Sequence, residues 1–158
     1  MTFKNRKEAG KQLAKSLKGY KNQSLVVYAL PRGGAVLGKE VARVLEAPLD
    51  LLIPRKIGHP QNSEYAIAAV TETGDVVKNE ADVAVVDQEW FDKEVGNQRA
   101  EAKRRRKRYV QDQIRTQVCG KIGMIIDDGV ATGLTMKAAI KELEQQEPSR
   151  IIVAVPVA

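Results

Sequence analysis

The sequence predicts an α/β domain built on a parallel sheet. Short apolar runs recur along the chain, at residues 25–30, 49–53, 122–126 and 151–155. These runs are continuous rather than alternating, which is typical of strands that are buried on both faces. Segments with helical spacing of apolar residues lie between the first two runs and between the last two. Strands that alternate with helices of this length indicate βαβ units and a parallel sheet.

Helical spacing occurs at three places around these runs. Residues 3–17 carry an apolar stripe on one face and lysines on the other, and Gly19 follows as a stop signal. Residues 34–47 follow the first strand, and residues 133–146 follow the strand at 122–126. Pro148 comes shortly after this last helix, as expected beyond a helix end.

The middle of the chain has a different pattern. Residues 64–70 and 76–77 flank the sequence T-E-T-G-D, which predicts a hairpin turn. Residues 81–86 form a further short strand candidate. Asp87 is placed to cap a long polar helix that reaches about Gln113.

Length and charge limit the classes of protein. A chain of 158 residues suits one domain with its own core. The formal net charge of +6 suits anionic ligands, without choosing between a small phosphate and a nucleic acid. The single cysteine, Cys119, permits no internal disulfide and is consistent with a cytoplasmic location. The N-terminus lacks an apolar signal core, and no apolar run approaches the roughly 18 residues that span a bilayer.

Residues 124–136, M-I-I-D-D-G-V-A-T-G-L-T-M, carry the most specific functional signal. An apolar run ends in Asp127 and Asp128, a Gly/Thr loop follows, and a helical pattern then begins. In open α/β sheets ligands bind beyond the carboxyl ends of the strands. The start of a helix offers N–H groups to an anion. Carboxylates beside a phosphate-binding loop therefore predict a sugar phosphate site, although a buried strand with a polar turn is the generic alternative.

This segment resembles the phosphoribosyl-pyrophosphate (PRPP) motif of type I phosphoribosyltransferases, a hydrophobic run with two acids and then G-x-x-T-G-x-T. The resemblance implies that Asp127 and Asp128 are the catalytic acids and hold the ribose. It also implies a loop that binds the 5′-phosphate, made of Gly129, Val130, Ala131, Thr132, Gly133, Leu134 and Thr135.

The same resemblance implies a fold. We expect a single domain over residues 1–158 with a type I phosphoribosyltransferase-like parallel core sheet flanked by helices. A flexible ribbon or helix insertion is expected at about residues 64–115, and residues 77–108 are the candidate lid on position alone. Family members usually continue past the strand V-A-V-P-V-A, so the C-terminal part is expected to be short and the base pocket incomplete.

Two further segments are expected at the same edge of the sheet. Arg32, Gly33 and Gly34 lie in L-P-R-G-G-A-V-L-G and resemble the pyrophosphate loop of the family, since glycine N–H groups and a guanidinium both bind anions. Arg55 and Lys56 follow the second strand and resemble a basic pair that contacts pyrophosphate. The generic alternative for the Arg32 segment is a tight turn with an exposed arginine, and for Arg55 and Lys56 it is a solvated loop pair.

The longest charge run, K-R-R-R-K-R, extends from Lys103 to Arg108. A solvated helix face is the first interpretation, with Glu101 paired to Arg105. Attraction of a polyanionic substrate and binding to an RNA or DNA backbone are the others. Only Tyr109 offers an adjacent stacking platform, which disfavours nucleic acid.

The implied reaction is transfer of the phosphoribosyl group of PRPP to a nitrogenous base, with release of pyrophosphate. Mg²⁺ is expected with PRPP because hard divalent ions bridge diphosphate oxygens and take few protein ligands, and no metal ligand is assigned to the protein. The family is commonly dimeric. The alternatives are a non-catalytic or regulatory PRPP-binding protein, which the short C-terminus favours, and an RNA- or DNA-binding module that uses residues 103–108.

Overall fold

The computed structural model describes residues 2–156, which cluster into two compact units. The first unit contains residues 2–52, 114–131 and 143–156, and the second contains residues 53–113 and 132–142. The expectation of a single domain with an insertion at about 64–115 stays a prediction.

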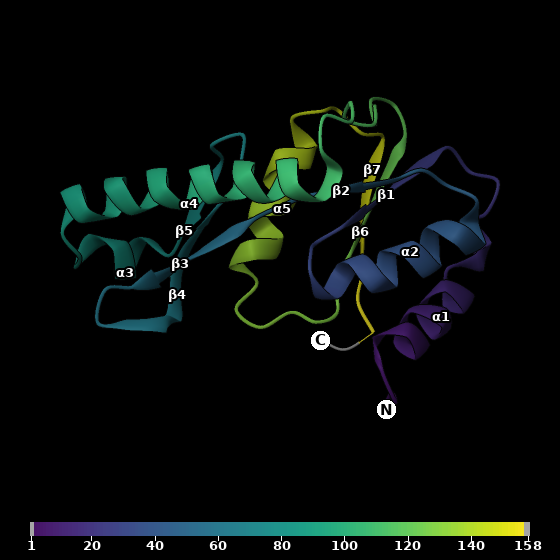
Figure 1. Cartoon of the computed structure of the whole chain (residues 1–158), viewed down its shortest axis with the longest axis horizontal. Coiled ribbons are helices and arrows are strands. Elements are labelled where there is room, and N and C mark those ends of the chain that lie inside the picture. The colour runs from purple at the N-terminus through teal and green to yellow at the C-terminus, as the bar shows by residue number, and fades with distance from the viewer. Residues whose placement is uncertain (1, 157–158) are drawn as a thin grey trace. The chain divides into compact units, whose positions relative to one another are not determined.

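A four-stranded parallel sheet forms the centre of the first unit (Figure 1). Its strands lie in the order β2 (Leu49–Leu51), β1 (Leu25–Ala29), β6 (Ile122–Ile126) and β7 (Arg150–Ala154). All residues of β1 and β6 are buried, whereas the edge strands β2 and β7 are partly exposed. The two central strands therefore explain the continuous apolar runs, and the predicted α/β class with a parallel sheet is confirmed.

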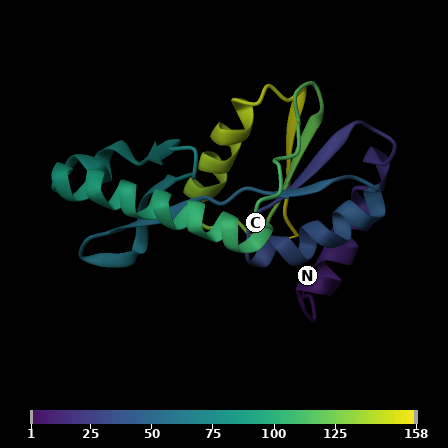
Figure 2. The same ribbon diagram turned by 45° about the horizontal axis from the view of Figure 1, so that its top comes forward.

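Two helices of the first unit, α1 (Arg6–Ser16) and α2 (Gly33–Leu45), lie alongside each other in both views (Figures 1 and 2). A short 3₁₀ turn, η1 (Lys18–Tyr20), follows α1. Helix α1 begins three residues after the predicted start because Asn5 caps it, with Oδ1 accepting from the Glu8 N–H at 2.9 Å. The helices share a core with the sheet, formed by Ala9, Ala14, Val27, Leu37, Val41, Met124 and other buried residues.

Helix α5 (Leu134–Glu144) connects β6 to β7. Its last two residues, Leu143 and Glu144, belong to the first unit, where Leu143 is fully buried. A Cβ atom at Gly123 of β6 would lie 2.6 Å from Cδ2 of Leu143. The glycine thus lets the end of α5 pack directly on the sheet, and the predicted strand–helix–strand order is confirmed.

An antiparallel sheet of three strands forms the second unit, in the order β3 (Arg55–His59), β4 (Asn62–Val70) and β5 (Val76–Lys78). The predicted hairpin is present, because β4 pairs antiparallel with β5 around the turn at 71–75. Gly74 has a φ of +96°, the left-handed conformation that glycine adopts most readily. The core of this unit contains Ile57, Ile67, Ala68, Val70, Val83 and Phe91.

One expectation for the second unit was wrong. Residues 81–86 are not a strand, because the short helix α3 (Glu80–Ala84) begins there. The Asn79 side chain accepts from the N–H groups of Ala81 and Asp82 and so caps the helix. Arg55 and Lys56 begin β3, which forms a hairpin with β4, so the alternative of a solvated loop pair does not describe them.

Helix α4 (Gln88–Val110) confirms the predicted long polar helix. Asp87 caps it, with Oδ1 accepting from the Trp90 N–H at 2.7 Å. The helix ends three residues before the predicted end, where Gln111 takes a φ of 54°. Within residues 2–156, no helix is both long and apolar enough to cross a membrane.

Candidate functional site

The ends of β1 and β6 bring two glycine-containing segments together in the first unit. The strands are parallel neighbours in register, with Ala29 opposite Ile126. The chain then turns at both ends, and the Leu30 N–H donates to the Ile126 carbonyl at 3.1 Å. Because both segments leave at the carboxyl edge of the sheet, the Pro-Arg-Gly-Gly turn lies beside the Asp127–Asp128 pair, as expected.

Contact between these segments is close enough to require glycine. A Cβ atom at Gly33 would collide with the Asp128 carboxylate, and one at Gly34 would lie 2.6 Å from the Ile126 carbonyl oxygen. Arg32 is exposed at the start of α2, and the peptide bond between Pro31 and Arg32 is cis. The main chain of the turn, at Gly33 and Gly34, therefore lies next to the acids.

Asp127 and Asp128 have different environments. The Asp127 carboxylate is half-buried and accepts from the Asp128 N–H at 2.8 Å. Burial raises the pKa of Asp127 to about 6, the hydrogen bond from the Asp128 N–H opposes this rise, and the charge of Asp128 adds to it. The Asp128 carboxylate instead receives the Arg6 guanidinium, with Nε 3.0 Å from Oδ2. One acid of the pair thus takes up a proton more readily than an ordinary aspartate.

The loop after the acids stays accessible. No residue from Asp127 to Thr135 is buried, and Ala131 and Thr132 are exposed. Gly133 has a φ of 81°, and its carbonyl accepts from the Lys137 N–H at 2.8 Å, inside the first turn of α5. The loop therefore leads into a helix start, where N–H groups can receive an anion.

The predicted basic pair lies in the second unit, on β3. The Arg55 Nε donates to Gln98 Oε1 at 3.1 Å, and Lys56 lies 3.6 Å from Glu64. Burial, and then the charge of Arg105, lower the pKa of Arg55. Arg55 is therefore held against α4, whereas the exposed Lys56 side chain is only weakly tied.

Part of the run from Lys103 to Arg108 is engaged within the protein. Glu101 accepts from Arg104 and Arg105 at 2.8 and 2.9 Å, and these hydrogen bonds lower its pKa to about 2. The expected Glu101–Arg105 pair is thus present. Arg106 turns inward and lies 3.5 Å from the buried Glu72. The run from Lys103 to Arg108 is therefore only partly a solvated helix face, because Arg106 pairs with the buried Glu72.

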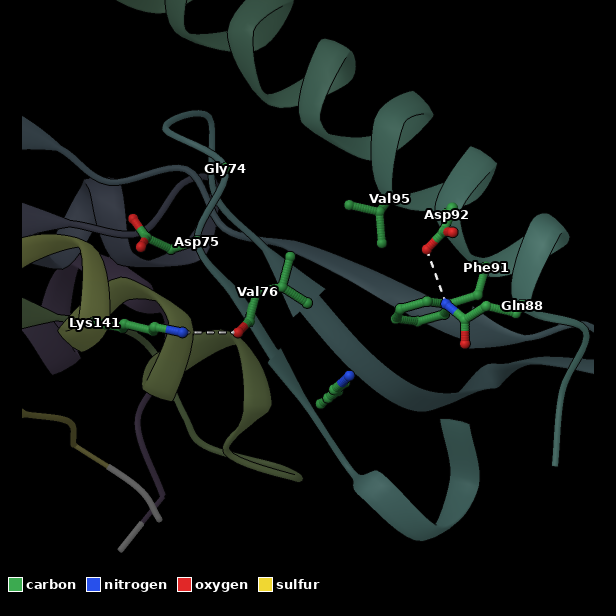
Figure 3. Close-up of a pocket in the computed structure, with 9 residues that line it drawn as sticks. Gly74, Asp75, Val76, Gln88, Phe91, Asp92, Val95 and Lys141 are labelled. Carbon is green, nitrogen blue, oxygen red and sulfur yellow. Dashed lines mark hydrogen bonds between the residues drawn. The ribbon is translucent and has the colours of Figure 1, made fainter. Parts of the chain in front are cut away.

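A cavity of about 400 Å³ in the second unit uses none of the predicted site residues (Figure 3). Phe91 and Val95 of α4 form its apolar side. The Lys141 amine donates to the Val76 carbonyl at 3.1 Å, and the Gln88 amide donates to Asp92 at 2.9 Å. Lys78 pairs with Glu80, and Asp75 accepts from the Thr73 hydroxyl. We assign it no role. Among residues 2–156, no cluster of three or more His, Cys, Asp or Glu side chains is arranged to hold a metal ion.

Arg6 is the residue that the sequence analysis missed. It is the first residue of α1, more than a hundred positions before its partner Asp128. Nothing in its local pattern separates it from the other cations of the first helix. Only the packing of α1 in the first unit brings its guanidinium to the acid pair.

Comparison with known proteins agrees with this architecture. Residues 3–158 match the family model described as the phosphoribosyl transferase domain, and the chain belongs to this family. It is 38% identical over 157 residues to a Mycobacterium tuberculosis protein provisionally named a phosphoribosyl transferase, a match that covers 98% of this chain and 35% of the relative. The chain thus spans about a third of the length of the curated relatives it matches.

Solved structures of known proteins share this fold. A crystal structure of a protein from Thermus thermophilus has a TM-score of 0.78 and 39% identity, over 98% of this chain and 74% of that one. A purine phosphoribosyltransferase from Pyrococcus horikoshii has a TM-score of 0.56 and 17% identity, over 98% and 74%. The second likeness shows the shared fold, so the type I phosphoribosyltransferase-like parallel sheet is confirmed.

Proposed function

We propose that the chain binds PRPP and transfers its phosphoribosyl group to a nitrogenous base, releasing pyrophosphate. The observation that carries this proposal is the close approach of Gly33 and Gly34 to Asp127 and Asp128. An anion-binding turn and a hydroxyl-accepting acid pair then share one edge of a sheet. Membership of the phosphoribosyl transferase family supports the reaction class.

The two acids hold the pentose in this proposal. A carboxylate accepts hydrogen bonds from hydroxyl groups, and the half-buried position of Asp127 strengthens such bonds relative to water. The reaction at the anomeric carbon develops positive charge, which Asp127 and Asp128 offset. The loop of residues 129–135 holds the 5′-phosphate through main-chain N–H groups at the start of α5.

The Pro-Arg-Gly-Gly turn receives the pyrophosphate. The Gly34 N–H already donates to the Leu30 carbonyl at 3.0 Å, so the anion contacts fall to the preceding N–H groups, at Arg32 and Gly33. The Arg32 guanidinium supplies a permanent charge next to them. Arg55 and Lys56 stay candidate pyrophosphate ligands on β3.

Mg²⁺ is proposed as the companion of PRPP. Among residues 2–156, no third His, Cys, Asp or Glu side chain is grouped with Asp127 and Asp128 to form a metal site. The two carboxylates would suit an ion that also keeps water and phosphate oxygens as ligands. When bound, the ion neutralises the diphosphate charge. A cytoplasmic location and a homodimer stay predictions.

A screen of free bases tests the proposal. The protein is incubated with PRPP, Mg²⁺ and one purine or pyrimidine base at a time, and pyrophosphate release is measured. Release with one base, abolished in Asp128→Asn, supports the transferase. PRPP binding without release for any base contradicts the transferase and favours the regulatory alternative. Absence of PRPP binding would exclude both the transferase and the regulatory PRPP-binding protein.

A further inference from the structure

Arg6 reaches the acid pair from a different element of the first unit. Its Nε lies 3.0 Å from Asp128 Oδ2, and the side chains of Arg6 and Asp128 are 64% and 37% exposed. Arg6 and Asp128 also line a cavity of about 270 Å³, together with Phe3, Leu37 and Pro156. The ion pair therefore faces a space that a small ligand can enter.

The exposed Arg6–Asp128 ion pair is expected to contribute little to the free energy of unfolding. Exposed ion pairs contribute little to folding because water screens them and long side chains lose conformational freedom. Helix α1 does not need Arg6 as a cap, since Asn5 already accepts from the Glu8 N–H. Packing of α1 against α2 rests on apolar contacts, with a Cβ atom at Gly10 only 3.0 Å from the Leu37 Cα.

We propose that Arg6 is a positioning residue that holds the Asp128 carboxylate in place for the hydroxyl groups of the pentose. This inference rests on the proposed function. A carboxylate has about four lone-pair sites, and a single guanidinium N–H occupies one of them. The Arg6 contact thus restrains the carboxylate and leaves acceptor sites for a sugar.

Charge supports the same role. Asp127 and Asp128 are adjacent anions, and a phosphorylated ligand brings more negative charge to them. Arg6 offsets part of this repulsion at Asp128, where no other cation contact is observed in residues 2–156. Charged residues close in sequence to these contacts are Asp127 beside Asp128, Arg32 at the start of α2, and Lys4, Lys7 and Glu8 around the start of α1.

Matched substitutions on one helix test the inference. Arg6→Met removes the charge and the donor but keeps an aliphatic chain, Arg6→Lys keeps the charge, and Lys7→Met is the control for the same charge change at an exposed neighbour. Binding of PRPP and of free pyrophosphate, each with Mg²⁺, is measured by calorimetry. We expect Arg6→Met to weaken PRPP binding about tenfold and pyrophosphate binding much less, because a charge-assisted hydrogen bond to the sugar-binding acid is lost.

The controls separate this role from charge alone. Lys7→Met should leave both affinities within about twofold, and Arg6→Lys should recover part of the PRPP affinity.

Three results would overturn the inference. Tighter PRPP binding in Arg6→Met would make Arg6 a competitor of the sugar. Equal losses in Arg6→Met and Lys7→Met would reduce its effect to net charge. PRPP binding in the wild type with no change in Arg6→Met would remove the role of Arg6 and leave the proposed function standing, whereas no PRPP binding in the wild type would remove the proposed function itself.

Discussion

A Cβ atom on Gly34 would lie 2.6 Å from the carbonyl oxygen of Ile126, the last residue of β6. A Cβ atom on the neighbouring Gly33 would likewise collide with the Asp128 carboxylate. Two glycines of one turn therefore set the distance between the proposed pyrophosphate loop and the proposed ribose-binding acids.

Alanine at either glycine should have distinguishable effects. Gly34→Ala forces the main chain of β6 to shift, so we expect a loss of about 1–3 kcal/mol in the free energy of unfolding. Gly33→Ala meets a side chain that can rotate away, so the loss of stability should be smaller and PRPP affinity should fall. Gly96→Ala, with open space around it in α4, is the control and should be neutral or slightly stabilising. Urea unfolding and PRPP calorimetry measure both effects, and equal stability of all three variants would contradict the close contact.

Asp128→Asn should separate sugar binding from pyrophosphate binding. The substitution keeps the size of the side chain but removes the carboxylate that is proposed to accept ribose hydroxyls. We expect PRPP affinity to fall about tenfold or more, because the lost bonds are charge-assisted. Free pyrophosphate should bind almost as well as before, or more tightly, since one nearby anion is gone. Equal losses for the two ligands would contradict a ribose contact.

The raised pKa of Asp127 predicts a specific pH dependence of stability. Its folded value of about 6 lies above the ordinary value of 3.8, so between these pH values the folded chain binds more protons than the unfolded chain. The contribution of this group to the free energy of unfolding therefore falls as pH rises through this window. Asp127→Asn should remove that decline. The difference in free energy of unfolding between Asp127→Asn and the wild type should therefore grow from about pH 4 to pH 6 and then level off. Denaturant unfolding of both proteins at several pH values measures this difference. If the free energies of unfolding of the two proteins changed in parallel with pH, the raised pKa of Asp127 would be contradicted.

The buried ion pair of the second unit should matter more than the exposed one beside it. Arg106 and Glu72 have side chains that are 11% and 8% exposed, and their closest atoms are 3.5 Å apart. Removing one partner leaves a charge away from water, so Arg106→Gln should cost about 3 kcal/mol. Arg104→Gln, whose 70% exposed side chain pairs with Glu101, should cost less than about 1 kcal/mol. Thermal or urea unfolding compares them, and similar losses would show that burial does not control these pairs.

Local chemistry explains why much of the fold could be predicted. The β1 and β6 strands are apolar at every position because both faces are covered, and such runs identify buried strands. Asp87 marks the start of α4 because its side chain bonds the first turn of its own helix. The acid pair and the glycine loops are likewise contiguous in sequence, so the candidate site could be recognised before its geometry was known.

Other features depend on distant residues. The apolar segment at 81–86 has the composition of a strand, but the Asn79 cap and the burial of Val83 make it a helix. The sequence around Arg55 does not predict the strand β3, because the pairing that makes it a strand comes from β4 and no local signal at Arg55 reports it. Isolated short segments do not determine their own pairing, which depends on what packs against them.

The parallel α/β class, the long capped helix and the acid–glycine segment could be predicted from local patterns, because each depends on residues close together in the chain. The remaining features of the site arise only from packing. Register between β1 and β6 placed Gly33 and Gly34 against the acids, burial raised the pKa of Asp127, and the packing of α1 delivered Arg6 to Asp128. Distances and desolvation arise only when separate segments meet, so a linear pattern does not encode them locally.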